Sequence, residues 1–361
     1  VLVELIGGHE PAKELVLTAI GNGKHVVTAN KALIAVHGNE IFEAARKHNV
    51  VVAYEAAIAG GIPIVKALRE GLAANSINWL AGIINGTGNF ILTEMRDKGR
   101  AFADVLKEAQ ELGYAEADPT FDVEGIDAAH KLTILSSVAF GIPLQFDQCY
   151  TEGISKVSAE DVANAESLGY RIKHLGLTRR TEAGVELRVH PTMIPEKCLI
   201  ANVHGVMNAV LVEGNAVGPT MYYGAGAGAE PTASAIVADL VDVVRDMAVN
   251  QNVRMPSLAF QQDAMSDSPI LPMDKVVTAF YMRMMVSEKP GVLAQITQIL
   301  GDAGISIEAI RQQTHESLQV PVIILTRPVQ EGHMNNAIAA IEALTDVHGE
   351  VTRIRVENLD G

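Results

Sequence analysis

The sequence predicts a mixed α/β protein built from three parts, and three observations support this. Within the first 56 residues, three short apolar runs alternate with two helical segments, an order typical of an open parallel sheet. Residues 154–212 contain β-like runs separated by turns, which indicates an antiparallel sheet. Residues 276–361 follow the order strand, helix, strand, strand, helix, strand, which is the ferredoxin-like arrangement.

The N-terminal part has the pattern of a Rossmann-type domain without its usual beginning. The chain opens on the apolar run VLVELIGG, and helices are expected at 11–20 and 37–49. No GxGxxG precedes the first helix, although that glycine-rich turn normally opens such a domain. We therefore expect residues 1–53 to form a partial Rossmann domain that lacks its front portion and is completed by a helix at 229–250.

Composition excludes several classes of protein. A chain of 361 residues that is 48% hydrophobic can bury two or three cores. The net charge of −15 argues against nucleic acids and anionic membranes as partners, and no apolar run is long enough to predict a membrane span. Cys149 and Cys198 form no CxxC pair, as expected for a reducing, cytoplasmic setting. The histidines lack metal-ligand spacing.

The most informative segment is GYAEADPTFDVEGIDAAHK, from Gly113 to Lys131. A proline and a glycine mark a loop, and residues 127–140 are predicted to form a largely apolar helix. Asp127 and Lys131 are four residues apart, so their side chains share one face of that helix. Such a pair alone is more often a solvated surface pair. The apolar helix and the dense acids before it favour instead a buried site, in which carboxylates bind an ammonium group and a lysine moves a proton.

This segment resembles the signature of the homoserine dehydrogenase family. That signature contains an alanine, then Gly-aromatic-small, Asp-Pro, and Asp-aliphatic-x-Gly-x-Asp followed four residues later by lysine. The chain matches every position, at Ala109, Gly113, Tyr114, Ala115, Asp118, Pro119, Asp122, Val123, Gly125, Asp127 and Lys131. The resemblance implies the reversible, NAD(P)-dependent interconversion of L-homoserine and L-aspartate 4-semialdehyde, in threonine and methionine biosynthesis.

The resemblance also implies roles for residues around this helix. Lys131 would be the general acid in reduction and the general base in oxidation, with its pKa lowered by burial or by Lys31. Asp127 would orient this lysine or bind the substrate hydroxyl. Glu116 and Asp122 would hold the substrate ammonium group.

Other residues are expected to border the substrate or the cofactor. Thr87 belongs to an Asn-Gly-Thr turn that resembles the family's turn at the substrate pocket, although Asn-Gly is also an ordinary turn signal. Gly113 would pack its backbone against both substrate and cofactor. Lys31 follows the strand-like VVTAN, which resembles the family's strand-and-lysine motif, so Lys31 would contact the nicotinamide cofactor and lie near the substrate. From its position alone, a surface lysine at the start of a helix is the alternative. Gly7 and Gly228 lie in glycine-rich stretches that resemble the family's contacts with NADP or NAD.

The segment YEAAIAGGIPIV resembles the family's loop for a monovalent cation, Na⁺ or K⁺. The resemblance implies that the cation ligands are mostly main-chain oxygens, contributed by Glu55, Ile58, Gly60 and Ile62. From the residues alone, a plain glycine turn between two domains explains the same sequence.

The segment EKPGVLAQITQILGDAGISI resembles the ACT domain, a small module that binds amino acids. The resemblance implies feedback by a pathway end product, with L-threonine as the expected effector. ACT domains usually bind effectors where two of them pair, with the loop around Gly291 at the contact. A homo-oligomer is therefore expected, either a homodimer through the central domain or a homotetramer through ACT pairing.

The expected domains follow from these segments. Residues 1–53, with the helix at 229–250, form the partial nucleotide-binding domain. Residues 54–228 form the substrate-binding, catalytic and dimerisation domain. Residues 251–275, which contain three prolines, form a linker, and residues 276–361 form the ACT regulatory domain.

Two other functions fit parts of the sequence. A semialdehyde dehydrogenase would need a nucleophilic cysteine, and neither Cys149 nor Cys198 has a nucleophile-like setting. An amino-acid-sensing ACT-domain protein without dehydrogenase activity would fit a chain that has only part of a Rossmann domain. The choice between NAD and NADP stays open, because the residue that reads the ribose belongs to the expected missing portion.

Overall fold

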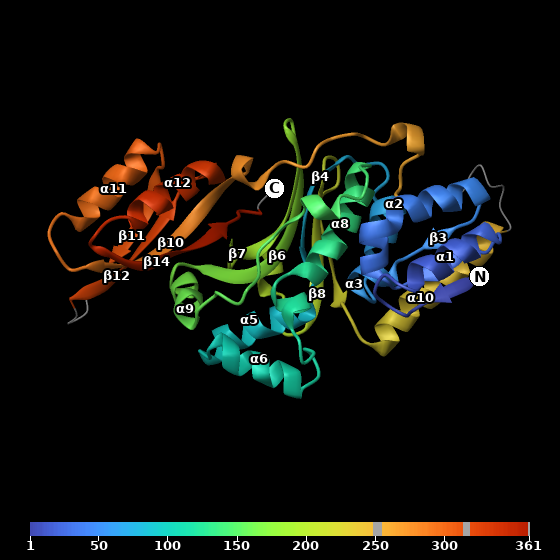
Figure 1. Cartoon of the computed structure of the whole chain (residues 1–361), viewed down its shortest axis with the longest axis horizontal. Coiled ribbons are helices and arrows are strands. Elements are labelled where there is room, and N and C mark those ends of the chain that lie inside the picture. The colour runs from blue at the N-terminus through green and yellow to red at the C-terminus, as the bar shows by residue number, and fades with distance from the viewer. Residues whose placement is uncertain (248–254, 313–317, 360–361) are drawn as a thin grey trace.

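The chain folds into two sheets and the helices that cover them (Figure 1), and the computed structural model describes residues 1–247, 255–312 and 318–359. A three-stranded sheet near the N-terminus lies at one end of the molecule. The sheet of the C-terminal part lies at the other end, and the central strands lie between them. Three short segments lie outside the described residues. They are 248–254, which holds the C-terminal end of the expected helix and the start of the expected linker, and 313–317 and 360–361 of the expected ACT domain.

The N-terminal part is a parallel α/β unit, as the sequence predicted. Its elements are β1 (Leu2–Glu4), α1 (Ala12–Gly21), β2 (Val26–Thr28), α2 (Lys31–His48) and β3 (Val52–Ala53). The strands are parallel in the order β1-β2-β3. The helix α10 (Ala229–Met247) returns to this unit and packs against β2. No helix of the described residues is long and apolar enough to cross a lipid bilayer.

The second helix begins earlier than the sequence suggested. We expected it at 37–49, but α2 starts at Lys31, because the side chain of Asn30 accepts a hydrogen bond from the backbone N–H of Leu33 at 3.0 Å and caps the helix. The strand that follows is only two residues long. The early start places Lys31 in the first turn of a helix, where the chain leaves β2.

The central part combines short helices with an antiparallel sheet. Its elements are α3 (Ala56–Ala59), α4 (Ile64–Lys66), β4 (Ile77–Ile83), α5 (Gly86–Lys98), α6 (Phe102–Glu111), α7 (Thr120–Val123), α8 (Ile126–Phe140), β5 (Tyr150–Thr151), α9 (Ala159–Ser167), β6 (Tyr170–Thr181), β7 (Gly184–Pro195), β8 (Met207–Gly214) and β9 (Gly218–Ala225). The order β7-β6-β4-β8-β9 is antiparallel throughout. This confirms the antiparallel sheet that we expected from residues 154–212.

The helix α8 lies at the centre of the molecule (Figure 1). It packs on β6 and β7 on one side and on α2 and α3 on the other. Every residue from Asp127 to Phe140 is buried. This burial explains why the helix is apolar nearly all round rather than on one stripe.

The C-terminal part has the ferredoxin-like order that the sequence predicted. Its elements are β10 (Val277–Ser287), α11 (Val292–Asp302), β11 (Ile307–Gln312), β12 (Gln319–Thr326), β13 (Val329–Gln330), α12 (Glu331–Glu342) and β14 (Val347–Val356). The main strands follow the order β11-β12-β10-β14. Both helices pack apolar side chains onto this sheet, including Ile296, Leu300, Met334 and Ile341.

The C-terminal sheet is continuous with the central sheet, which the sequence did not indicate. The end of β14 runs parallel to β7, with Arg355 opposite Thr192 and Val356 opposite Met193. Arg355 is fully buried at this junction. Its guanidinium group donates to Glu331 Oε2 and to Glu152 Oε2, both at 2.8 Å. The junction is therefore held by backbone pairing and by an ion-pair network.

Replacing Arg355 by alanine is expected to destabilise the protein by about 3–5 kcal/mol, because Glu331, only 1% exposed, would lose its fully buried cationic partner and keep only the ion pair with Arg353. Chemical denaturation measures this loss. The exposed Arg327, in the turn between β12 and β13, is the matched control, and Arg327→Ala should change the free energy of unfolding by less than about 0.5 kcal/mol. Equal losses in the two variants would contradict a stabilising role for the junction.

Candidate active site

The turn before α8 is shaped by a glycine. Gly125 precedes the helix with a φ of 84°, a left-handed conformation that glycine adopts without strain. A β-carbon at this position would lie 3.0 Å from the ring of His174 on β6. The glycine therefore lets the turn pack closely on the central sheet, so that the first residues of α8 are buried rather than exposed.

A carboxylate and two lysines form a cluster at this end of α8, in which Asp127 and Lys131 are buried and Lys31 is partly exposed. The ammonium group of Lys131 donates to Asp127 Oδ2 and to the carbonyl oxygen of Ile84, both at 2.7 Å. The ammonium group of Lys31 lies 3.0 Å from Asp127 Oδ1. Asp127 is 3% exposed and Lys131 is 8% exposed. The solvated surface pair that was the alternative from sequence is therefore excluded.

The two lysines control the charge of Asp127. Burial alone would raise the pKa of this carboxyl, but Lys131 and Lys31 outweigh burial and hold the pKa of Asp127 well below its usual range. Asp127 is therefore ionised at neutral pH and acts as a fixed negative charge between two cations.

The pKa of Lys131 is lowered, as we expected. Burial is the largest cause, the charge of Lys31 adds to it, and Asp127 opposes both. A lysine with a lowered pKa releases and regains a proton closer to neutral pH than a solvated lysine does. The side chain is thus suited to general acid–base chemistry.

Asn85 connects this cluster to a third acid. Its amide nitrogen donates to Asp122 Oδ1 at 2.8 Å and to Asp127 Oδ2 at 2.9 Å, and its oxygen caps α5 by accepting from the N–H of Gly88 at 2.7 Å. Burial raises the pKa of Asp122. We did not predict Asn85 as a site residue. The available signal was its place before Gly86-Thr87 at the start of a helix, where asparagine is a common cap.

The loop between α6 and α7 carries the remaining expected substrate contacts. Thr87 donates to the carbonyl oxygen of Tyr114 at 2.6 Å and so ties this loop to the start of α5. Gly113 is exposed and has a φ of 74°. Glu116 is exposed too, and its carboxylate makes no hydrogen bond or ion pair with any described residue. The structure thus brings Lys131, Asp127, Lys31 and Asp122 together but leaves Glu116 outside the cluster.

A pocket of about 400 Å³ lies where the N-terminal strands end. Gly7 and Gly228, both expected to contact the cofactor, line it together with Asn30, which directly precedes Lys31. The first turn of α10 forms one wall. Free backbone N–H groups at the start of a long helix favour an anion such as a phosphate. The start of α10 is therefore the part of this largely apolar wall where a phosphate of a dinucleotide would fit.

At Gly60, the segment expected to bind a cation crosses the chain segment around Gly226 at close range. Gly60 has a φ of 53°, and a β-carbon there would lie 2.6 Å from the carbonyl group of Gly226. The carboxylate of Glu55 accepts from the N–H groups of Val65 and Lys66, at 2.8 and 2.9 Å, so it caps α4. In the described residues, no group of three or more His, Cys, Asp or Glu side chains could hold a metal ion.

Cys149, which is half-buried, bears on the alternative of a semialdehyde dehydrogenase, and His130 is a further buried side chain beside the cluster. Burial raises the pKa of Cys149 to about 12, so this thiol is not a nucleophile at neutral pH. His130, beside Lys131, is 3% exposed and stacks on Phe146 with ring centroids 4.2 Å apart. Neither of its ring nitrogens has a hydrogen-bond partner among the described residues. Burial lowers the pKa of His130 to about 4, so the ring is neutral.

Gly60→Ala is expected to destabilise the protein by about 1–3 kcal/mol, because alanine is strained at this backbone conformation and its β-carbon would meet Gly226. Thermal unfolding monitored by circular dichroism tests this. Gly71→Ala is the control, since a β-carbon there meets nothing within 4 Å, and it should leave stability unchanged or slightly raised. An unaffected Gly60→Ala protein would show that the crossing is looser than the structure indicates.

Comparison with known proteins gives the same assignment along the whole chain. Family models match residues 63–241 ("Homoserine dehydrogenase"), 1–55 ("Homoserine dehydrogenase, NAD binding domain") and 281–346 ("ACT domain"). The homoserine dehydrogenase of Pseudomonas aeruginosa is 68% identical over 100% of this chain and 83% of its own length. That of Neisseria gonorrhoeae is 59% identical over 99% of this chain and 83% of its own length.

Solved structures agree with these relatives. The crystal structure of a homoserine dehydrogenase from Thiobacillus denitrificans is 67% identical, with a TM-score of 0.96 over 99% of this chain and 82% of that one. A hyperthermophilic archaeal homoserine dehydrogenase, solved in complex with NADPH, is 29% identical, with a TM-score of 0.59 over 68% of this chain and 72% of that one. With the buried acid–lysine cluster and the matches to all three parts, the chain belongs to the homoserine dehydrogenase family of oxidoreductases.

Proposed function

We propose that this protein catalyses the reversible, NAD(P)-dependent interconversion of L-homoserine and L-aspartate 4-semialdehyde. The observation that carries the proposal is the buried cluster of Lys131, Asp127 and Lys31, in which a lysine of lowered pKa is held by a permanently ionised carboxylate. A bound nicotinamide dinucleotide supplies or accepts the hydride. The protein supplies position and a proton.

Lys131 donates the proton to the carbonyl oxygen of the aldehyde during reduction and takes it back from the hydroxyl group during oxidation. Its two hydrogen bonds, to Asp127 and to the Ile84 carbonyl, fix the direction of the ammonium group. Lys31 keeps a second positive charge next to the carboxylate, which favours the neutral form of Lys131. Asp127 is in this scheme a positioning residue for the lysine.

Asp122 and Glu116 hold the substrate ammonium group in this scheme. Asp122 lies within the cluster, where the side-chain amide of Asn85 donates a hydrogen bond to one of its carboxylate oxygens. This position supports the proposed role of Asp122. Glu116 belongs to the loop that Thr87 ties to α5, and its carboxylate is not engaged by another described residue. Closure of this loop over the substrate would bring Glu116 and Gly113 to the site.

Gly7, Gly228, Gly113 and Lys31 contact the cofactor. The family model for an NAD-binding domain and the relative in complex with NADPH support a nicotinamide dinucleotide. Gly7 and Gly228 line one pocket, and a side chain at either position would intrude on a ligand there. Assays with NAD⁺ and NADP⁺ side by side decide the preference between the two.

A monovalent cation, Na⁺ or K⁺, is proposed at the main-chain oxygens of Glu55, Ile58, Gly60 and Ile62. The tight turn at Gly60 and the side chain of Glu55, which is turned away to cap α4, support a site built from main-chain oxygens. This loop joins the N-terminal and central parts, so a cation there would stabilise their relative position.

We also propose how the chain divides into domains, how it is regulated and how it assembles. We propose the domain division 1–53 with 229–250, 54–228, 251–275 and 276–361, with the last segment as a regulatory domain that responds to L-threonine. The ACT family match supports an amino-acid ligand. A homodimer or a homotetramer in the cytoplasm completes the proposal, and the two free cysteines are consistent with a reducing compartment.

Lys131→Ala is expected to lower kcat by about 10²- to 10⁴-fold, with a much smaller change in KM, because the proton transfer is lost while the binding groups remain. Steady-state kinetics with L-homoserine measures both constants. Lys24→Ala, at an exposed position, is the control and should retain wild-type kinetics. A Lys131→Ala enzyme that keeps turnover within a few-fold of wild type would assign the proton transfer to Lys31 or to water.

The rate of NAD(P)⁺ reduction by L-homoserine, with and without L-threonine, tests the function itself. We expect activity that L-threonine suppresses. The full-length gene product should be used, since the relatives extend beyond the matched region. Absence of activity with both cofactors, together with retained threonine binding, would favour an amino-acid-sensing protein instead.

A further inference from the structure

The face of α8 that bears the acid–lysine cluster also carries a third polar side chain. His130 and Lys131 follow Asp127 by three and four positions, so all three side chains share one face of the helix. Asp127 and Lys131 bond to each other. His130 is buried beside them, but neither of its ring nitrogens has a hydrogen-bond partner in the part of the chain that the structure describes. Two hydrogen-bonding atoms on this face are therefore unused.

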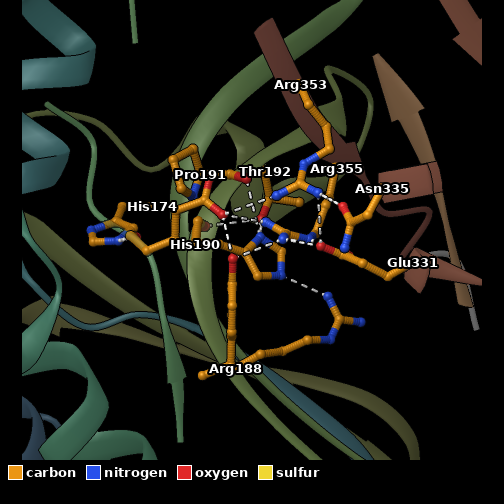
Figure 2. Close-up of polar contacts among 11 residues, drawn as sticks. His174, Arg188, His190, Pro191, Thr192, Glu331, Asn335, Arg353 and Arg355 are labelled. Atoms are coloured by element: carbon orange, nitrogen blue, oxygen red, sulfur yellow. Dashed lines mark hydrogen bonds and ion pairs between the residues drawn. The ribbon is translucent and has the colours of Figure 1, made fainter. Parts of the chain in front are cut away.

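A buried histidine on β7 shows how the same protein satisfies such a ring. In Figure 2, the guanidinium group of Arg188 donates to His190 Nε2 at 2.8 Å, and His190 Nδ1 lies 2.9 Å from Thr192 Oγ1. A buried polar group without a partner costs about 1–3 kcal/mol. The unpaired nitrogens of His130 therefore lower the stability of the protein on its own, and a bound group that pairs with them would recover this free energy.

Two aromatic side chains fix the orientation of the His130 ring. The ring stacks on Phe146 with centroids 4.2 Å apart, and Phe121 lies against it at 5.5 Å. The stack with Phe146 uses a face of the imidazole, whereas both nitrogens lie on its edge. Phe121 belongs to the short helix α7 and is 39% exposed. A rotation of this side chain would open the edge of the imidazole to a ligand.

His130 lies on the side of the cluster that meets the N-terminal part. The ammonium group of Lys31 lies 5.7 Å from the centre of the Phe121 ring, which in turn contacts His130. Burial is the largest cause that lowers the pKa of His130, and the charges of Lys31 and His9 add to it, so both side chains lie near the ring. His9 follows Gly7 in the loop after β1, and Gly7 lines the pocket proposed for the dinucleotide.

An uncharged amide is the group that fits this position. A neutral imidazole offers one N–H donor and one acceptor nitrogen, and a carboxamide offers an acceptor oxygen and an NH₂ donor in return. The pKa of His130, lowered by burial to about 4, keeps the ring neutral. The nicotinamide ring of an oxidised dinucleotide is positively charged, and Lys31 and Lys131 already place two cations nearby. A neutral partner binds that ring without adding repulsion.

We propose that His130 binds the carboxamide group of the nicotinamide dinucleotide and so sets the position of the nicotinamide ring beside Lys131. The inference rests on the proposed function, because it adds a cofactor contact to that site. It assigns a side-chain contact to the nicotinamide end of the cofactor, in addition to the glycines proposed to border the dinucleotide with their backbones.

Replacing the imidazole by a phenyl ring separates this role from a structural one. His130→Phe keeps the aromatic stack and removes both unpaired nitrogens, so the melting temperature without cofactor should stay at the wild-type value or rise. The affinity for NAD⁺ or NADP⁺, whichever binds more tightly to the wild type, should fall by at least about 10-fold, which corresponds to about 1.4 kcal/mol. Calorimetry on the full-length gene product measures both quantities. A lower melting temperature with unchanged affinity would overturn the proposal.

His190→Phe is the matched control, because this histidine is also buried but has partners for both nitrogens. It should lower the melting temperature, since the buried Arg188 would lose an acceptor, and it should leave cofactor affinity at the wild-type value.

ADP-ribose and its 2′-phosphate, which lack the nicotinamide ring, identify the group that His130 contacts. His130→Phe should bind these fragments as the wild type does. A loss of affinity for the fragments as large as the loss for the dinucleotides would show a general disturbance of the nucleotide site and overturn the proposal.

The inference and the proposed function can fail separately, because cofactor affinity is measured without L-homoserine. A wild-type protein that oxidises L-homoserine, together with a His130→Phe protein of wild-type cofactor affinity, would overturn the role of His130 and leave the dehydrogenase function intact. A protein whose dinucleotide binding is sensitive to His130→Phe, but which oxidises no L-homoserine, would support the role of His130 and overturn the proposed function.

Discussion

The burial of Asp127 between two lysines is the interaction on which the rest of the site depends. A buried lysine is costly unless an opposite charge lies beside it, and Asp127 provides that charge to Lys131 and Lys31 together. The cluster in turn requires α8 to be enclosed by the central sheet and by α2. The N-terminal and central parts must therefore pack together for the two lysines to converge on Asp127.

The side chain of Asn85 holds the neighbouring carboxylates of Asp122 and Asp127 in place. Two acids close together raise each other's pKa unless donors separate them, and the amide of Asn85 donates to both Asp122 and Asp127. Its oxygen meanwhile caps α5. One side chain thus fixes the start of a helix and the relative position of two carboxylates, so the site is held by secondary structure as well as by charge.

The junction between β7 and β14 gives the C-terminal part a fixed position on the central part. Parallel backbone pairing and the buried Arg355 join them. The strand β7 also lies under α8. The part that matches the ACT family is therefore attached to the strand that supports α8, the helix of the acid–lysine cluster. Networks of this kind couple sites when they have two arrangements of similar free energy.

The local features of this protein could be predicted from its sequence. The apolar helix that carries Asp127 and Lys131, the parallel N-terminal unit and the ferredoxin-like order of the C-terminal part were all predicted, because each depends on periodicity and spacing within a few tens of residues. The pKa direction of Lys131 was also predictable once burial was assumed. Only the cap at Asn30 moved the start of α2 away from its expected position.

Contacts between distant segments of the chain could be recognised only in the folded protein. The convergence of Lys31 on Asp127, the carbonyl of Ile84, the bridging amide of Asn85 and the pairing of β14 with β7 join residues that are tens to more than a hundred positions apart. A single sequence contains no periodic signal for such contacts, because they arise from packing of whole elements against one another. The pocket of about 990 Å³ between the turn before α8 and the C-terminal strand β14 has the same origin, because its two walls come from distant parts of the chain and only their packing creates it.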